Sequence, residues 1–259
     1  MWLMSSQTAE LHTERRNLGE RARRAVDRGP RPYFRGRLHA SAAWFFGGSS
    51  TALTAVAAAH SGSFFLTLTT AVYAMCLVGM LTVSALYHRV PWRSESTIQH
   101  WRRADHAMIA IFIVATYGPI TAAAFGAQWF VRRGGIDALG GFMGWGGSWL
   151  LLVGWLAAAG AVVLNLFWIT HPRWLAVTVY MVLGWMAVFG VAAFYHALGL
   201  APSLLILLGG VVYSLGAIVY GKKWPNPSER WFGFHELFHA ATILAAGLHH
   251  IAIWLVVLD

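Results

Sequence analysis

Charged residues are scarce in this sequence. Asp, Glu, Lys and Arg make up 11% of the 259 residues, whereas hydrophobic residues make up 58%. Soluble domains carry about 25% charged and about 45–50% apolar residues, so a soluble domain of ordinary composition is excluded. The apolar runs are long and do not alternate with polar residues, which excludes a membrane barrel. The composition therefore predicts an all-α membrane protein.

Cysteine is nearly absent. The one cysteine, Cys76, lies within an apolar run, so no disulfide can form within the chain, and we interpret it as a small buried hydrophobic residue. The first residues, Met1–Ser5, lack the basic and apolar regions of a cleavable signal peptide. Insertion into the membrane is therefore expected to depend on the first apolar span.

Positive charge is concentrated at one place in the chain. The net charge is +9, and nine of the 19 basic residues are arginines within residues 15–37. Because the rest of the chain offers no soluble binding domain, we attribute this charge to membrane topology and expect no nucleic-acid partner. We expect an Arg-rich cytoplasmic tail at 1–38, followed by a transmembrane domain at 39–259. Within the tail, residues 8–26 fit a basic amphipathic helix lying on anionic lipid.

Seven apolar runs are about long enough to cross the hydrocarbon core of a bilayer. We expect seven transmembrane helices at 39–60, 64–88, 105–125, 145–168, 174–195, 200–220 and 235–257. The glycine-rich stretch at 140–147 blurs the start of the fourth span. In this topology 17 Lys and Arg residues fall on the side of the N-terminus, and only Arg132 and Arg133 fall on the other. The N-terminus is therefore predicted to be cytoplasmic and the C-terminus to lie outside.

Two histidines at the start of the last span predict a metal site. His235 and His239 are four residues apart, so on a helix they lie on one face, one turn apart, as two ligands of one metal ion do. The predicted topology places His88, at the end of the second span, at the same membrane depth. Three imidazoles with an open fourth position are typical of a catalytic zinc site. We therefore predict that His88, His235 and His239 bind Zn²⁺.

Two further polar residues are predicted to complete this site. Asp105 begins the third span at the same depth, and Ser84 lies one helical turn before His88. We expect Asp105 to hold the zinc-bound water and act as the acid/base group, and Ser84 to donate a hydrogen bond to that water or to a substrate carbonyl. Three alternatives stay open: Asp105 is a direct ligand in place of one histidine, Asp105 only satisfies a helix N-terminus, or Ser84 only packs.

The remaining histidines are expected to lie outside the metal site. His106 follows Asp105 directly and points about 100° away, as Glu236 does from the predicted ligand face. His249 and His250 lie about 15 Å deeper than His239, where a histidine can line a polar cavity or form hydrogen bonds within the bundle. Histidines at loop edges have no assigned role: His60, His171 and His196.

Three motifs together resemble the hemolysin III family, the bacterial branch of the progestin and adiponectin receptor (PAQR) superfamily. They are Ser84–Ala–Leu–Tyr–His88, then Asp105–His106 with Ala115–Thr–Tyr–Gly–Pro119, and His235–Glu–Leu–Phe–His239 with His249 ten residues on. The resemblance covers about residues 40–258. It implies seven helices with a cytoplasmic N-terminus, a position in a bacterial plasma membrane and a zinc ion near the cytoplasmic side.

The resemblance also implies roles for single residues. The positions that match His88, His235 and His239 hold the zinc, the position that matches Asp105 holds the zinc-bound water, and the position that matches Ser84 lies close by. The wider group of membrane hydrolases includes alkaline ceramidases, so the resemblance suggests chemistry on lipids. The long Arg-rich tail is not part of the shared pattern.

The leading functional hypothesis is a zinc-dependent integral membrane hydrolase that cleaves a lipid amide or ester with zinc-activated water. A second hypothesis is a non-enzymatic sensor or regulator of membrane lipid, in which the zinc is structural. A third, the pore-forming cytolysin suggested by the family name, is disfavoured because no amphipathic pore-lining segment is present. Membrane lipids are the expected partners. The sequence identifies neither the lipid nor the oligomeric state.

Overall fold

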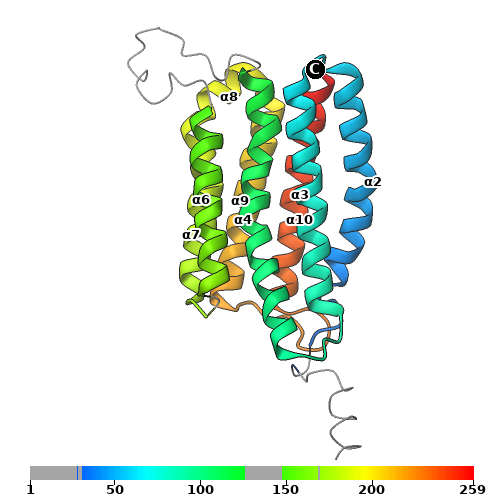
Figure 1. Ribbon diagram of the computed structural model, residues 1–259, viewed down its shortest axis with the longest axis vertical. Coiled ribbons are helices and arrows are strands. Elements are labelled where there is room, and N and C mark those ends of the chain that lie inside the picture. Colours follow the sequence, from blue (N-terminus) through cyan, green and yellow to red (C-terminus); the bar gives the residue numbers. More distant parts are fainter. Residues whose placement is uncertain (1–27, 29–30, 126–147, 169) are drawn as a thin grey trace, which may run out of the picture.

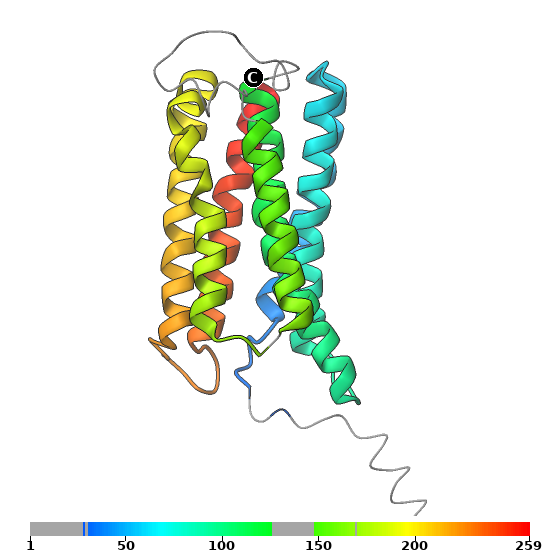
Figure 2. The same ribbon diagram turned by 60° about the vertical axis from the view of Figure 1, so that its left-hand side comes forward.

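The computed structural model describes residues 28, 31–125, 148–168 and 170–259. Within these residues the structure is helical, and no strand is present beyond one isolated bridge between Ser228 and Phe232. The helices stand side by side in one bundle (Figures 1 and 2). They are α2 (Arg37–His60), α3 (Phe64–Arg89), α4 (Glu95–Phe125), α6 (Ser148–Phe167), α7 (Arg173–Trp185), the 3₁₀ helix η2 (Met186–Gly190), α8 (Val191–Leu198), α9 (Leu200–Lys222) and α10 (Phe234–Leu258). The predicted all-α class is confirmed.

Six of the described helical segments are long and apolar enough to cross a membrane. They are α3, α4, α6, the continuous stretch Arg173–Leu198, α9 and α10. The predicted first span also forms a helix, α2, but its 24 residues include four serines and threonines in the run Ser49–Thr54 and are less apolar. The role of α2 as a seventh transmembrane helix therefore stays a prediction, as does the orientation of the termini.

Two predicted spans differ from the observed helices. The third was expected to begin at Asp105, but α4 begins ten residues earlier, and its first turns include a hydrogen bond from Gln99 Nε2 to Glu95 Oε1 of 2.8 Å. The fifth was expected to be one helix, but the 3₁₀ helix η2 interrupts it. The Tyr117 hydroxyl donates to the carbonyl oxygens of Leu183 and Gly184, just before this interruption, and so satisfies acceptors next to it.

The predicted amphipathic helix at 8–26 and the glycine-rich stretch at 140–147 lie outside the described residues.

The α4 helix forms the centre of the bundle. Every residue from Val114 to Ala122 is buried, which means that all sides of this stretch are covered by other helices. α4 contacts α3, α6, α7, α8 and α10. By contrast, α9 exposes a row of large apolar side chains, as a lipid-facing helix does. These are Leu204, Leu207, Leu208, Val211, Leu215 and Ile218.

Glycines allow α9 to lie close to α10. A Cβ atom at Gly216 would come within 2.8 Å of the Ala241 Cβ, and one at Gly209 would overlap the His249 ring. Small residues at such positions let helix backbones approach in a membrane. The glycines of the sixth predicted span thus serve packing within the chain.

One end of the bundle carries most of the described basic residues. α3 and α9 end there, and α2, α4, α7 and α10 begin there; we call it the basic end. It is the lower end in Figure 1, and the C-terminus lies at the opposite end. Polar side chains from four distant stretches of sequence therefore meet at the basic end.

Candidate metal centre

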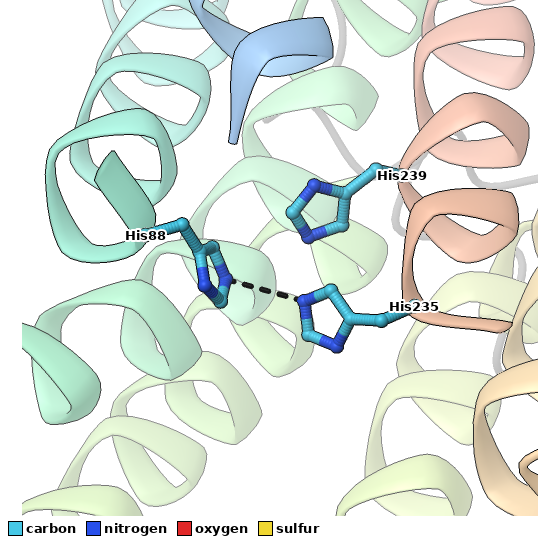
Figure 3. Close-up of side chains that lie close together, drawn as sticks. All are labelled: His88, His235 and His239. Atoms are coloured by element: carbon cyan, nitrogen blue, oxygen red, sulfur yellow. Dashed lines mark hydrogen bonds between the residues drawn. The ribbon is translucent and has the colours of Figure 1, made fainter. Parts of the chain in front are cut away.

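Three histidine side chains converge at the basic end. His88 lies in the last turn of α3, and His235 and His239 lie in the first two turns of α10. Each offers one nitrogen atom such that these atoms all lie within 4.8 Å of one another. The Nε2 atoms of His88 and His235 are 3.2 Å apart (Figure 3). The three residues predicted to bind metal are thus brought together.

These residues fit a metal ion. His239 is buried, and its Nδ1 atom has no hydrogen-bond partner among the described residues. A buried polar atom without a partner costs about 1–3 kcal/mol, so a ligand that satisfies it is favoured. Two facing Nε2 atoms likewise need a shared proton or a cation between them. A set of three imidazoles suits zinc and other divalent transition metals.

Asp105 lies beside this cluster. Its Oδ2 atom is 3.8 Å from the His88 Nε2, and its carboxylate is a hydrogen-bond partner of the buried Ser84 side chain. Because α4 begins at Glu95, Asp105 lies well inside the helix and cannot cap its N-terminus. That alternative is therefore wrong. The distance to His88 leaves room for an ion or a water molecule between them, and the chemical roles of Asp105 and Ser84 stay predictions.

His39, which was not predicted from the sequence, also belongs to the cluster. It lies in the first turn of α2, is buried and stacks on the His239 ring, with ring centres 3.8 Å apart and planes 5° apart. Neither of its ring nitrogens has a hydrogen-bond partner among the described residues. A usable signal existed, because His39 begins the first predicted span at the same membrane depth as His88.

The segment before α2 is fixed to the histidine cluster and its helix by direct contacts. Arg31 Nη1 donates to the His88 carbonyl oxygen at 2.9 Å, and Arg35 forms an ion pair with the fully buried Glu236. Glu236 also accepts a hydrogen bond from the Gly233 N–H at 2.9 Å, which caps α10. From the sequence, these arginines were expected to serve only membrane topology. Their contacts show a structural role in addition.

The other histidines lie at different places in the bundle. The His249 Nε2 atom donates a hydrogen bond of 3.0 Å to the Ile206 carbonyl oxygen, because a carbonyl oxygen can only accept. The predicted hydrogen bond within the bundle is confirmed. His171 was expected at a loop edge without a role, yet its ring is buried and hydrogen-bonded to Asn165 Oδ1 at 3.1 Å. His106 borders the cavities described next, with its Nδ1 bonded to the Arg102 carbonyl at 2.9 Å.

Two cavities meet at the histidine cluster. The apolar cavity, of about 140 Å³, extends between the helices from Ser84 and His239 towards Trp185 and His249, and most of its lining is hydrophobic. The basic vestibule, of about 310 Å³, opens at the basic end and is lined by polar side chains, among them His88. Five residues line both cavities: Asp105, His106, Ala176, Tyr220 and His235. A molecule at the cluster can therefore touch both an apolar and a polar space.

The sequence profile of a family described as "Haemolysin-III related" matches residues 29–250, which include every residue of the cluster. The chain belongs to this haemolysin-III-related family. The resemblance inferred from the three motifs is thus confirmed. The family membership and the six apolar helices make this chain a multi-pass bacterial membrane protein.

Similar proteins in this family come from bacteria and yeast. "Hemolysin-3 homolog" of Bacillus subtilis (strain 168) is 28% identical over 178 residues, which are 68% of this chain and 75% of that protein. "Hemolysin-3" of Bacillus cereus is 27% identical over 131 residues, 50% of this chain and 52% of that protein. A short stretch of 49 residues, 17% of this chain and 16% of the other, is 39% identical to "ADIPOR-like receptor IZH2" of Saccharomyces cerevisiae.

Proposed function

We propose that this haemolysin-III-related protein is a zinc-dependent hydrolase that cleaves an amide or ester bond of a lipid within the membrane. The observation that supports it is the meeting of two cavities at the histidine cluster. An acyl chain fits the apolar cavity, and a polar headgroup and water fit the basic vestibule. The carbonyl that joins chain to headgroup then lies at the boundary, beside His235 and Asp105.

In this mechanism three residues hold the metal and one, Asp105, transfers the proton. His88, His235 and His239 bind Zn²⁺ through ring nitrogens. Zinc, when bound, polarises the scissile carbonyl and lowers the pKa of a water molecule to about 7. Asp105 takes a proton from the attacking water and delivers it to the leaving amine or alcohol as the acyl carbon–nitrogen or carbon–oxygen bond breaks. The products are a carboxylic acid and the freed headgroup.

Ser84 and the cavity walls support this reaction. The Ser84 hydroxyl orients the Asp105 carboxylate, its hydrogen-bond partner, and can turn to donate to the substrate carbonyl oxygen. The apolar walls exclude bulk water from the acyl side of the bond, which strengthens the electrostatic interactions there. Tyr220 and Ala176 line both cavities and so flank the path of the cleaved bond.

The test combines metal analysis with turnover, using the full chain purified in neutral detergent. We expect near one zinc per chain and turnover on at least one member of a panel of ceramides, acyl amides and esters. Asp105→Asn should keep the zinc and lose about 10²–10⁴-fold in turnover. His239→Ala should lose the zinc, whereas the control His196→Ala, at an exposed position of α8, should keep both. Zinc-loaded wild type without turnover on the whole panel would contradict the proposal.

A second function is supported by the placement of the ligands. His88 comes from α3, and His235 and His239 come from α10, so a zinc ion would join two helices distant in sequence. In a lipid sensor with structural zinc, Asp105→Asn would leave the cellular phenotype intact, and His239→Ala would lower the melting temperature. Dye release from liposomes tests the pore-forming alternative, for which we expect a negative result.

We also propose that α2 is a seventh transmembrane helix and that the basic end faces the cytoplasm. The first helix, α2, begins at the basic end, and the C-terminus lies at the opposite end of the bundle (Figure 1). A chain that crosses the membrane an odd number of times has its two ends on opposite sides in this way. The 17-to-two distribution of basic residues favours the cytoplasm for the basic end. An alkaline phosphatase fusion at Asp259 should be active. An inactive fusion together with an active N-terminal one would reverse this topology.

A further inference from the structure

The basic vestibule is strongly positive. Arginines from three separate stretches line it: Arg28, Arg31, Arg35, Arg102 and Arg173. Among the described residues that line the vestibule, Asp105, at its inner end, is the only one with a carboxylate. Positive charge at the membrane edge is expected for topology alone, but topology does not require five guanidinium groups around one cavity. This arrangement focuses positive potential into a confined space.

Three of the five arginines already have partners. Arg28 and Arg31 donate to the carbonyl oxygens of Tyr87 and His88, each at 2.9 Å, and Arg35 pairs with Glu236. Arg102 and Arg173 differ, because neither guanidinium group has a hydrogen-bond or ion-pair partner within the described part of the chain. The guanidinium group of Arg173 lies over the Tyr220 ring, 5.7 Å from its centre, and uses none of its hydrogen-bond donors there.

These two arginines stand where the vestibule joins the apolar cavity. Arg102 lies one helical turn before Asp105 and His106, which line both cavities. Arg173 contacts Tyr220, which also lines both. Five donors of each guanidinium group form a planar fork that matches the oxygens of a phosphate group. An anionic group between Arg102 and Arg173 would therefore lie directly next to an apolar space suited to an acyl chain.

We propose that Arg102 and Arg173 bind the phosphate group of an anionic amphiphile whose acyl chain occupies the apolar cavity. This inference rests on the proposed lipid function and names the chemical class of the lipid, a phosphate-bearing one. The remaining arginines contribute long-range attraction, and their own contacts hold the wall of the vestibule in place. Because the phosphate binds on the vestibule side, the bond next to the histidine cluster is the one at the carbonyl of the acyl chain.

The test measures binding of the anionic lipid and does not depend on its hydrolysis. The full chain in neutral detergent is titrated with a diether phosphatidylglycerol and, separately, with a diether phosphatidylcholine that has the same chains. A hydrolase of amides and esters cannot cleave these ether lipids. Bound lipid is counted by native mass spectrometry. We expect one saturable phosphatidylglycerol per chain, bound at least tenfold more tightly than phosphatidylcholine. Arg102→Gln/Arg173→Gln should remove this preference, and raising the ionic strength should weaken it.

The control removes the same charge from the same end of the bundle. Arg93 and Lys222 are exposed and lie outside the vestibule lining, so Arg93→Gln/Lys222→Gln should change the affinity less than twofold. Arg102→Lys/Arg173→Lys keeps the charge without the planar fork and should retain part of the preference. The melting temperature shows that each variant is folded. Equal binding of both lipids by wild type, or an unchanged preference in the glutamine variant, would overturn the proposal.

A parallel titration distinguishes lipid from free phosphate. If sn-glycerol 3-phosphate or inorganic phosphate displaces phosphatidylglycerol at millimolar concentration, and only from proteins that keep both arginines, the phosphate group itself is recognised at this site. Displacement that is equal in wild type and in the glutamine variant would contradict it. Absence of hydrolysis on the substrate panel would leave this binding result standing, so the two proposals fail separately.

Discussion

Replacing Arg35 by alanine is expected to destabilise the protein strongly. The Glu236 side chain is fully buried, and Arg35, whose side chain is 22% exposed, is its ionic partner across 201 positions of sequence. Removal of one partner from a buried ion pair costs about 3–5 kcal/mol, because the remaining charge is left without compensation. The partial exposure of Arg35 favours the lower value, about 3 kcal/mol. For a chain of this size that corresponds to a fall of roughly 6–12 °C in melting temperature.

The assay is thermal unfolding of the full chain in neutral detergent, followed by circular dichroism at one fixed scan rate. Arg37→Ala is the matched control. Arg37 is exposed two residues away and stacks over the Tyr33 ring, 4.0 Å from its centre, so its loss should cost about 0.5–1 kcal/mol. The double variant Arg35→Gln/Glu236→Gln has two neutral amides in place of two charges and should recover most of the stability.

An equal shift in melting temperature for Arg35→Ala and Arg37→Ala would contradict this prediction. The burial of Glu236 would then not depend on Arg35. A second measurement links the pair to the metal site. Glu236 follows His235 directly and accepts the Gly233 N–H that caps α10, so Arg35→Ala should also lower the zinc content more than Arg37→Ala does.

Two further predictions concern the packing around the histidines. Gly36 has a φ of 71°, and a Cβ atom there would lie 2.8 Å from the His88 Cβ. Gly62 also has a positive φ, of 58°, but open space surrounds it. Gly36→Ala should therefore lower the melting temperature and the zinc content more than Gly62→Ala does. His250 bonds to the buried Tyr73 hydroxyl at 3.1 Å, so His250→Phe should cost about 1–3 kcal/mol by leaving that hydroxyl unpaired, and exposed His196→Phe should cost little. Equal melting temperatures within either pair would contradict the corresponding reasoning.

The sequence predicts the local features of this protein well. Apolar runs of sufficient length predict helices, because a chain in lipid must satisfy its backbone hydrogen bonds internally. The four-residue spacing of His235 and His239 fixes their common face on any helix, and the alternation of spans places His88 and Asp105 at the same depth. The family motifs fall within these segments. The three histidines of the candidate metal centre, His88, His235 and His239, could therefore be named before any helix was placed.

Local patterns fail where a helix ends or bends for reasons outside its own sequence. The start of α4 was missed because the helix was expected to be no longer than the membrane span, whereas a polar helical segment can extend beyond the hydrocarbon core. The break at Met186–Gly190 coincides with acceptor carbonyls satisfied by Tyr117, a residue of another helix. The sequence of residues 174–195 alone does not indicate that Tyr117 will bond there.

By itself, then, the sequence determined that the chain is helical, that it belongs in a membrane and that three histidines and one aspartate share one depth. Tertiary structure alone decided that His39 stacks on His239, that Arg35 pairs with Glu236, and that two cavities of opposite character meet at the cluster. The physical reason is that helix formation depends on neighbouring residues. The faces that adjoin depend on how all helices pack at once, and in lipid the hydrophobic effect does not choose between apolar faces.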